Sequence, residues 1–265
     1  MESFSFNGLV ASYDETRSFD KGCFDSALQY ISNAFPVSAF PVLFEPGIGN
    51  GRIAVPLAQM GYRVVGADIS DEMLNALKRR LEENSETLPV LFPRADITRL
   101  PFPDEVFDAA VAVHIFYFVR DWKRAVREIL RVVRNGGAVI LMHTGTGSEI
   151  PFVNRRYKEI CASLGSPVPE LGVKSNREAA DYFQSLGCEA EWIQDRWRWI
   201  SRIPVGKALE YIRNRAYSFT VFPSDSIHAV AVEILESELK GKFDAPVEVP
   251  NQVYLVILRK PESGR

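Results

Sequence analysis

The most informative stretch is Val42-Leu43-Phe44-Glu45-Pro46-Gly47-Ile48-Gly49-Asn50-Gly51-Arg52, in which a short apolar run, an acid and three alternating glycines follow one another. An amphipathic helical pattern continues over residues 53–60. Glycine adopts backbone conformations that other residues resist, and without a side chain it lets the main chain approach a ligand at the amino end of the next helix. The stretch therefore predicts a strand, a turn and a helix, with a nucleoside bound at the turn.

The spacing of the glycines separates the possible nucleotide ligands. A dinucleotide site follows the pattern G-x-G-x-x-G, but counted from Gly47 the third glycine position is occupied by Arg52. The lysine and hydroxyl residue that a P-loop needs after its glycines are missing. The spacing therefore disfavours a pyrophosphate or triphosphate ligand, and a nicotinamide dehydrogenase ranks last among the alternatives.

Further elements follow in regular alternation. Apolar runs predict strands at 62–68, 90–94 and 107–114, and residues 130–141 predict the end of a helix, a glycine stop at Gly136-Gly137 and a fifth strand. Strands that alternate with helices predict a parallel sheet covered on both faces. The sequence therefore belongs to the α/β class.

Polar side chains stand where the predicted strands end. Glu45, Asp68, Asp96 and His114 occupy these positions, and open α/β sheets bind ligands at the carboxyl ends of their strands. Two alternatives stay open. Asp68 could cap the helix that begins at Ser70, and Asp96 could be a turn residue before a proline-containing loop.

The E-x-G-x-G-x-G pattern of Glu45, Gly47, Gly49 and Gly51, with the later elements in the expected order, resembles class I S-adenosylmethionine-dependent methyltransferases of the type 11 group. The resemblance implies a Rossmann-like sheet of seven mostly parallel strands, helices on both faces and an antiparallel last strand. It also implies S-adenosylmethionine as the cofactor.

The resemblance implies roles for individual residues. Asp68 would accept both ribose hydroxyls, Asp96 would accept from the adenine amino group, and Ile97 would pack on the ring. Arg17 or Arg52 would pair with the methionine carboxylate through a charge-assisted hydrogen bond. The full set of predicted cofactor residues is Tyr13, Arg17, Glu45, Gly47, Gly49, Gly51, Arg52, Asp68, Ile69, Met73, Asp96, Ile97 and His114.

We expect a single domain over residues 1–265. Its amino-terminal segment, 1–40, contains the Tyr13-Asp14 pair and resembles a segment that covers the cofactor in small-molecule methyltransferases, the alternative being a solvated, mobile terminus. Helical cap insertions are expected at about 146–187 and 201–250. They contain predicted helices at 152–164, 176–186, 204–216 and 224–239, and strands are predicted at 188–200 and 251–259.

Aromatic residues gather around the second insertion. Together with Trp192, Trp197 and Trp199, it supplies rings that could form the wall of an apolar substrate pocket, the alternative being ordinary core.

Composition limits the partners. The formal charge is −3 and the pI near 5.8, so no overall positive field favours nucleic acid or an anionic membrane. Three separated cysteines, Cys23, Cys161 and Cys188, favour neither a disulfide framework nor a zinc cage, and no metal site is predicted. Without a membrane-spanning run or a secretion signal, a soluble, cytoplasmic protein is expected. The sequence does not indicate an oligomeric state.

Catalysis is expected to rely on in-line methyl transfer with release of S-adenosylhomocysteine, and therefore on positioning. If the acceptor carries an acidic proton, the candidate catalytic residues are His114, His143 and Tyr117, with Tyr13 as a further candidate base. His114 and His143 end neighbouring predicted strands, so they are expected to lie close together.

The segment 114–118 favours one class of acceptor. It reads His-Ile-Phe-Tyr-Phe instead of the [ND]-P-P-[YF] signature of enzymes that methylate exocyclic amines. We therefore expect a small, partly apolar acceptor. The alternatives are a non-catalytic S-adenosylmethionine-binding protein and an RNA methyltransferase that uses Arg196, Arg198, Arg202, Lys207, Arg213 and Arg215.

Overall fold

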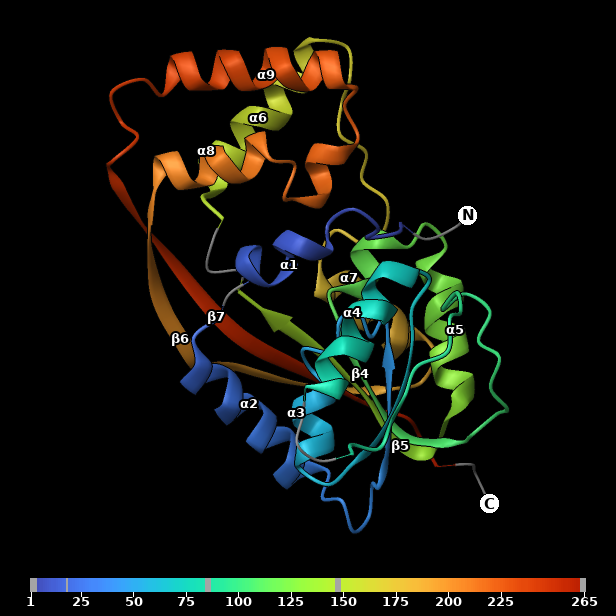
Figure 1. Cartoon of the computed structure of the whole chain (residues 1–265). Coiled ribbons are helices and arrows are strands. Elements are labelled where there is room, and N and C mark those ends of the chain that lie inside the picture. Colours follow the sequence, from blue (N-terminus) through green and yellow to red (C-terminus); the bar gives the residue numbers. More distant parts are fainter. Residues whose placement is uncertain (1–3, 18, 84–86, 146–148, 263–265) are drawn as a thin grey trace.

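The computed structural model describes residues 4–17, 19–83, 87–145 and 149–262. They form a seven-stranded sheet in the order β3-β2-β1-β4-β5-β7-β6 (Figure 1). All neighbouring strands are parallel except β7, which is antiparallel to both β5 and β6. The predicted fold class is confirmed. The strands are β1 (Val42–Pro46), β2 (Arg63–Ala67), β3 (Val90–Leu91), β4 (Phe107–Val113), β5 (Val133–Thr144), β6 (Glu189–Pro204) and β7 (Pro246–Arg259).

Helices cover both faces of this sheet and form a separate group beyond its edge. On one face α2, α3 and α4 share a hydrophobic cluster with the sheet, and α5 and α7 share another cluster on the opposite face. The helices are α1 (Val10–Thr16), α2 (Lys21–Ala34), α3 (Ala54–Gln59), α4 (Asp71–Glu82), α5 (Trp122–Val132), α6 (Pro151–Ser163), α7 (Asn176–Ser185), α8 (Val205–Arg213) and α9 (Asp225–Glu238), with short 3₁₀ helices η1 (Ile115–Phe118) and η2 (Ser218–Val221). No helix among the described residues is long and apolar enough to cross a bilayer.

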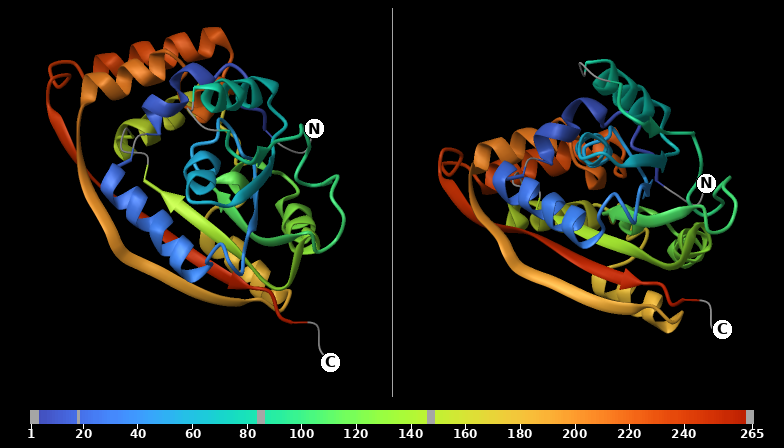
Figure 2. Two further views of the ribbon diagram at one scale, coloured as in Figure 1. Left: turned by 60° about the horizontal axis from the view of Figure 1, so that its bottom comes forward. Right: turned by 90° about the horizontal axis from the view of Figure 1, so that it is seen from below.

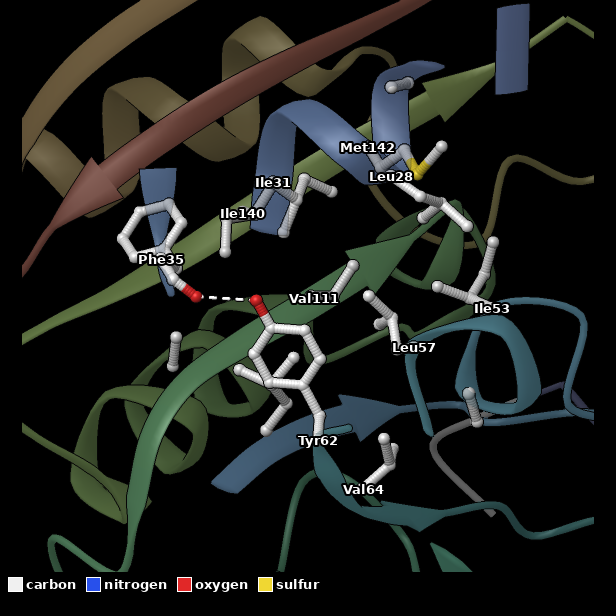
Figure 3. Close-up of a cluster of buried hydrophobic side chains, with 14 of the residues drawn as sticks. Leu28, Ile31, Phe35, Ile53, Leu57, Tyr62, Val64, Val111, Ile140 and Met142 are labelled. Atoms are coloured by element: carbon white, nitrogen blue, oxygen red, sulfur yellow. Dashed lines mark hydrogen bonds between the residues drawn. The ribbon is translucent and has the colours of Figure 1, made fainter. Parts of the chain in front are cut away.

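The α2 face shows how the sheet is anchored. Leu28 and Ile31 of α2 pack with Ile140 and Met142 of β5 (Figure 3). At the edge of this cluster the hydroxyl of Tyr62 donates a hydrogen bond of 2.6 Å to the carbonyl of Phe35, both residues being buried. The bond satisfies a polar group that would otherwise be costly to bury. It also fixes the end of α2 against the start of β2.

Two helix starts that the sequence predicts are confirmed. The Ser70 hydroxyl accepts from the Met73 amide at 3.2 Å at the start of α4, and the Ser224 hydroxyl accepts from the Ile227 amide at 3.4 Å at the start of α9. Each serine satisfies an amide that has no partner within its helix. Serine at these positions therefore sets where the two helices begin.

The predicted glycine stop before the fifth strand is wrong. The helix ends at Val132 and β5 begins at Val133, so Gly136 and Gly137 lie within the strand, at an irregularity between the β4–β5 pairs Phe107–Val133 and Ala109–Ala138. A Cβ on Gly137 would lie 2.5 Å from the Asp108 carbonyl. The glycine pair therefore permits close approach of two strands and does not end a helix.

The last two strands are longer than predicted. β6 continues past Ile200 and β7 begins before Asn251, and they remain paired as far as Pro204 and Pro246. This two-stranded extension leads out of the sheet to a cap made of α6, α8, η2 and α9 around one hydrophobic cluster (Figures 1 and 2). α7 packs on the sheet. Of the first predicted insertion, only α6 therefore joins the cap.

Candidate functional site

The glycine turn after β1 has the geometry that the sequence predicts. Gly47, Gly49 and Gly51 all have positive φ, at +70°, +54° and +79°, where side chains are strained. A Cβ on Gly51 would lie 2.3 Å from Leu77 Cδ1, whereas a Cβ on Gly49 would meet nothing closer than the Gly47 carbonyl at 3.9 Å. Gly51 is therefore required by the core, and Gly49 leaves open space beside the turn.

Asp68 joins this turn to the end of β2. One of its carboxylate oxygens accepts from the Gly49 amide at 3.0 Å and the other accepts from the Ser70 amide at 2.8 Å. Ser70 is the residue that caps α4, so the alternative role of Asp68 as that cap is not observed. Burial raises the pKa of Asp68, although the amide bonds oppose the shift. A carboxylate can accept about four hydrogen bonds, so both oxygens retain capacity for a ligand.

A pocket opens above the turn, at the carboxyl ends of β1, β2 and β4. It encloses about 570 Å³ including its mouth. Its walls include eight predicted cofactor residues, namely Tyr13, Gly47, Gly49, Asp68, Ile69, Met73, Ile97 and His114. Residues from five separate segments of the chain are thus brought to one site.

Residues that the sequence did not single out also line this pocket. Phe4 and Phe6 cover it, and Phe118 of η1 lies beside them. The Phe4 amide donates to the Phe118 carbonyl at 2.8 Å, and the Phe6 and Phe118 rings meet edge to face with centroids 4.8 Å apart. The alternating aromatics of Phe4-Ser5-Phe6 were the available signal. They lie upstream of the Tyr13-Asp14 pair on which the predicted cover was based.

Five predicted cofactor residues lie outside the pocket wall: Arg17, Glu45, Gly51, Arg52 and Asp96. One Asp96 oxygen accepts from the Thr98 amide and from the Thr98 hydroxyl, both at 2.9 Å, which is the turn arrangement that the sequence allows as an alternative. Its neighbour Ile97 faces the pocket. A contact between Asp96 and adenine therefore stays a prediction.

The two arginines lie together near the end of α1. The Arg52 guanidinium donates to the Arg17 carbonyl at 2.6 Å and lies 4.5 Å from the Phe19 ring centre. Both guanidinium groups lie over the Tyr13 ring, at 5.4 Å for Arg17 and 5.8 Å for Arg52. Tyr13 itself lines the pocket. The arginines are thus one aromatic ring away from the pocket, and their pairing with a carboxylate stays a prediction.

Two buried acceptors near the turn have no hydrogen-bond partner among the residues that the structure describes: Glu45 Oε2 and Asn50 Oδ1. The side chains are 4% and 5% exposed, so solvent does not replace the missing partners. Burial, and then the charge of Asp68, raise the pKa of Glu45 well above its usual value. A ligand with an ammonium group would supply the missing donors. The residues present therefore fit the amino-acid end of S-adenosylmethionine.

His114 is held by the end of β5. Its backbone is left-handed, with φ +54°, and its Nε2 lies 3.0 Å from the Thr144 carbonyl and 3.1 Å from the Thr144 hydroxyl. Burial, followed by the nearby His143, lowers the pKa of His114 to about 3. The imidazole is therefore neutral at physiological pH.

His143 and Tyr117 complete the set of predicted catalytic residues. The rings of His114 and His143 are 4.9 Å apart, so the expected proximity is confirmed. His143 stacks on Tyr254 at 4.6 Å, and burial lowers its pKa. Burial raises the pKa of Tyr117 to about 12. None of the three is tuned as a base for neutral pH, so their catalytic roles stay predictions.

The tryptophans of β6, namely Trp192, Trp197 and Trp199, do not line this pocket. Trp197 packs on the α2 face, where its indole donates to the Ser26 hydroxyl at 2.9 Å. Trp192 packs on the opposite face, with Arg177 over its ring at 4.8 Å.

Known proteins are similar to this chain in sequence, and solved structures are similar to it in fold. A family model described as a methyltransferase domain matches residues 44–141. The chain is 30% identical over 182 residues to a demethylmenaquinone methyltransferase of Clavibacter sepedonicus, an alignment that covers 68% of this chain and 72% of that protein. It is also 30% identical over 241 residues to a 27-O-demethylrifamycin SV methyltransferase of Amycolatopsis mediterranei, with 88% and 82% covered. Of two other curated relatives the chain spans 49% and 46% of the length.

Among solved structures, the YcgJ protein from Bacillus subtilis superimposes with a TM-score of 0.61. The match covers 90% of this chain and 99% of that protein at 18% sequence identity. At this identity the similarity establishes the fold alone.

Proposed function

This chain belongs to the class I S-adenosylmethionine-dependent methyltransferases of the type 11 group, and on that premise we propose that it methylates a small, partly apolar acceptor. The observation that carries the proposal is the aromatic lining of the pocket, to which Phe4, Phe6 and Phe118 contribute three rings. An apolar, aromatic lining favours a small molecule that leaves water on binding. It does not favour a polymer that remains largely solvated.

The cofactor residues divide according to their chemistry. Asp68 is proposed to accept the ribose hydroxyls, and Ile69, Met73 and Ile97 to pack on the base. The unpaired oxygens of Glu45 and Asn50 are proposed to accept from the ammonium group.

When bound, S-adenosylmethionine supplies an electrophilic methyl group on a sulfonium, for transfer in line to the acceptor. The protein then contributes to catalysis by positioning the acceptor and the methyl group, which can supply a large part of the acceleration of such a reaction. His114 stays neutral and so adds no second cation beside the sulfonium. A group with a pKa of about 3 is a weak base at neutral pH, so we propose that His114 orients the reactants and does not remove a proton.

Of the six basic residues in the RNA-binding alternative, five are paired with carboxylates, and Arg196 lies over the Tyr30 ring at 5.0 Å. Arg202 pairs with Glu248 at 2.9 Å and Arg215 with Asp225 at 2.9 Å. Arg198 and Arg213 are also paired, with Asp195 and Glu236, and Lys207 pairs with Glu210 at 3.1 Å. Surface charges matched in this way offer phosphates little net positive field. This favours a small acceptor over RNA.

Isothermal titration of the purified chain with S-adenosylmethionine, S-adenosylhomocysteine and, in parallel, NAD tests the proposal. We expect micromolar binding of the two adenosyl compounds and none of NAD. An acceptor screen that measures S-adenosylhomocysteine release then separates an enzyme from a protein that only binds the cofactor. Salt-sensitive binding of RNA, lost on charge reversal of Arg202 and Arg213, would instead support the RNA alternative.

A further inference from the structure

A second pocket lies beside the cofactor pocket, between η1, the segment 168–174 and η2. It encloses about 720 Å³ including its mouth. Its lining includes Tyr117, Phe118, Lys158, Val173, Phe219 and Phe222, together with the paired charges of Lys174 and Glu170. We refer to it as the cap groove, because its outer wall is formed by cap residues of η2 and α6.

The cap groove begins where the cofactor pocket ends. Phe118 lines both, and the Phe4 ring, which covers the cofactor pocket, lies 6.0 Å from Phe118 and 5.4 Å from Phe222. The Tyr117 ring lies 6.1 Å from that of His114 at the tip of β4. A molecule in the groove would therefore reach the cofactor pocket past one layer of aromatic rings.

The walls of the groove are fixed by specific bonds. The Arg215 guanidinium donates to the carbonyls of Thr220 and Pro223, the latter at 3.1 Å, and thus fixes the segment that carries Phe219 and Phe222 at two points. On the opposite wall the Val173 amide donates to the Phe116 carbonyl at 3.1 Å. Gly172 lies so close to η1 that a Cβ would overlap the Phe116 carbonyl. The groove is therefore built into the fold.

One cation stands at the rim of the groove without a carboxylate partner. Lys158 lies with its ammonium 4.7 Å from the centre of the Phe219 ring. Across the ranges that the structure describes, no carboxylate oxygen lies within 4.0 Å of this ammonium, whereas Lys174 on the same rim pairs with Glu170 at 3.6 Å. An exposed ammonium beside aromatic walls can bind an anionic group whose apolar body is already held.

From this juxtaposition we infer that the cap groove is the acceptor site, and that the acceptor is an apolar molecule with one anionic group. The apolar body lies between Phe118, Phe219 and Phe222, and the anion pairs with Lys158. The inference rests on the proposed function, since it assigns an acceptor class to the same enzyme. It adds to that function the requirement that the acceptor carries an anionic group, and this requirement comes from Lys158 in the cap groove.

Two fluorescent probes test the inference without knowledge of the acceptor. 1-Anilinonaphthalene-8-sulfonate is apolar with one sulfonate, and N-phenyl-1-naphthylamine is the same ring system without that charge. Both are titrated into the full chain saturated with S-adenosylhomocysteine. We expect Lys158→Met to weaken binding of the sulfonate about tenfold, as loss of one charge-assisted contact does, and to leave the neutral probe unchanged. Phe222→Ala is expected to weaken both.

Lys123→Met is the matched control. Lys123 also lies over aromatic rings, 5.6 Å from Trp122 and 5.3 Å from Tyr182, but it is on α5, away from the groove. Equal effects of Lys158→Met and Lys123→Met, or unchanged binding of both probes to Phe222→Ala, would overturn the inference.

S-Adenosylhomocysteine binding is measured for every variant by titration. A chain that binds no adenosyl compound contradicts the proposed function, and the probes are then titrated without it. If a variant loses probe binding but still binds S-adenosylhomocysteine, the exchange has affected the cap groove and not the cofactor site. The two failures are therefore distinguishable.

Discussion

The exchange of Gly49 for alanine tests whether the ligand lies on the glycine turn. Gly49 lines the cofactor pocket, and its added Cβ would have no protein atom closer than 3.9 Å. The new methyl group therefore meets no obstacle in the protein. It occupies space that, by our proposal, belongs to the cofactor.

Two separate effects are expected, and their sizes differ. Alanine at φ +54° costs about 1–2 kcal/mol of backbone strain, which lowers Tm by about 2–8 °C in a chain of this size. A methyl group forced into a well-packed contact costs about 1–3 kcal/mol, equivalent to about a 5- to 150-fold loss of affinity for S-adenosylmethionine. Thermal denaturation measures the first effect and isothermal titration measures the second.

Gly241→Ala separates strain from overlap with the ligand. Gly241 has φ +82° and open space around its Cβ, but it lies in the turn after α9. We expect a similar fall in Tm and unchanged affinity. If Gly49→Ala also kept wild-type affinity while its Tm fell as in the control, the cofactor would not lie on this turn, and the central interpretation of residues 42–52 would be refuted.

Three further outcomes are expected from the charged groups of the site. Asp68→Ala should weaken S-adenosylmethionine binding by about 1–3 kcal/mol in a titration, since a charged acceptor is lost. Asp71→Ala is the control, because this acid lies three residues away with an exposed side chain and should leave binding unchanged. Equal effects of the two exchanges would remove Asp68 from the site. Because the pKa of Glu45 is raised and a cationic ligand lowers it again, ligand binding should release a proton from Glu45 and should tighten as the pH rises. Titrations in buffers of different ionisation enthalpy should detect this released proton. The Glu45→Gln variant should bind without releasing it. The pKa of His114 is about 3 in the folded state against 6.5 in the unfolded state, so protons favour the unfolded state below pH 6.5. Acidification from pH 7 to 5 should therefore lower the free energy of unfolding by about 2 kcal/mol. A His114→Gln variant whose Tm fell just as steeply with pH would contradict this assignment.

The sequence was most informative where structure depends on neighbouring residues. The glycine turn at 47–51, the helix starts at Ser70 and Ser224, and the position of Asp68 at the end of a strand follow from local conformation, and the structure has these features as expected. Strand β5 shows the limit. The Gly136-Gly137 pair has the local features of a helix stop, and only the approach of the Asp108 carbonyl from β4 explains its place inside the strand.

Long-range contacts explain what the sequence could not predict. Phe4 and Phe6 line the pocket because the Phe4 amide bonds to the Phe118 carbonyl, 114 positions further along the chain. No periodicity within residues 1–40 encodes that contact. In the same way, the tryptophans of β6 could be assigned to a pocket or to the core only once the sheet had placed them on opposite faces.

The amino-terminal cover has a consequence for the order in which the substrates bind. It is held down by polar contacts with the core: the Gly8 amide donates to Glu72 at 2.7 Å, and the Asn50 side chain donates to Asp14 at 2.9 Å. In our proposal the cofactor lies beneath this segment, so we expect the segment to lift when the cofactor enters, which would withdraw the Phe4 ring from Phe222 beside the cap groove. We therefore expect closure over the cofactor to complete the proposed acceptor site, and the cofactor to bind first.

Product inhibition, measured once an acceptor is known, tests this order. With the cofactor binding first and S-adenosylhomocysteine leaving last, S-adenosylhomocysteine should compete with S-adenosylmethionine and act as a mixed inhibitor against the acceptor. Phe4→Ala should weaken acceptor binding more than cofactor binding, because Phe4 contacts both Phe118 and Phe222. If the acceptor bound equally well with and without cofactor, the cover would not form part of the acceptor site, and the aromatic contact between Phe4 and Phe222 would serve stability alone.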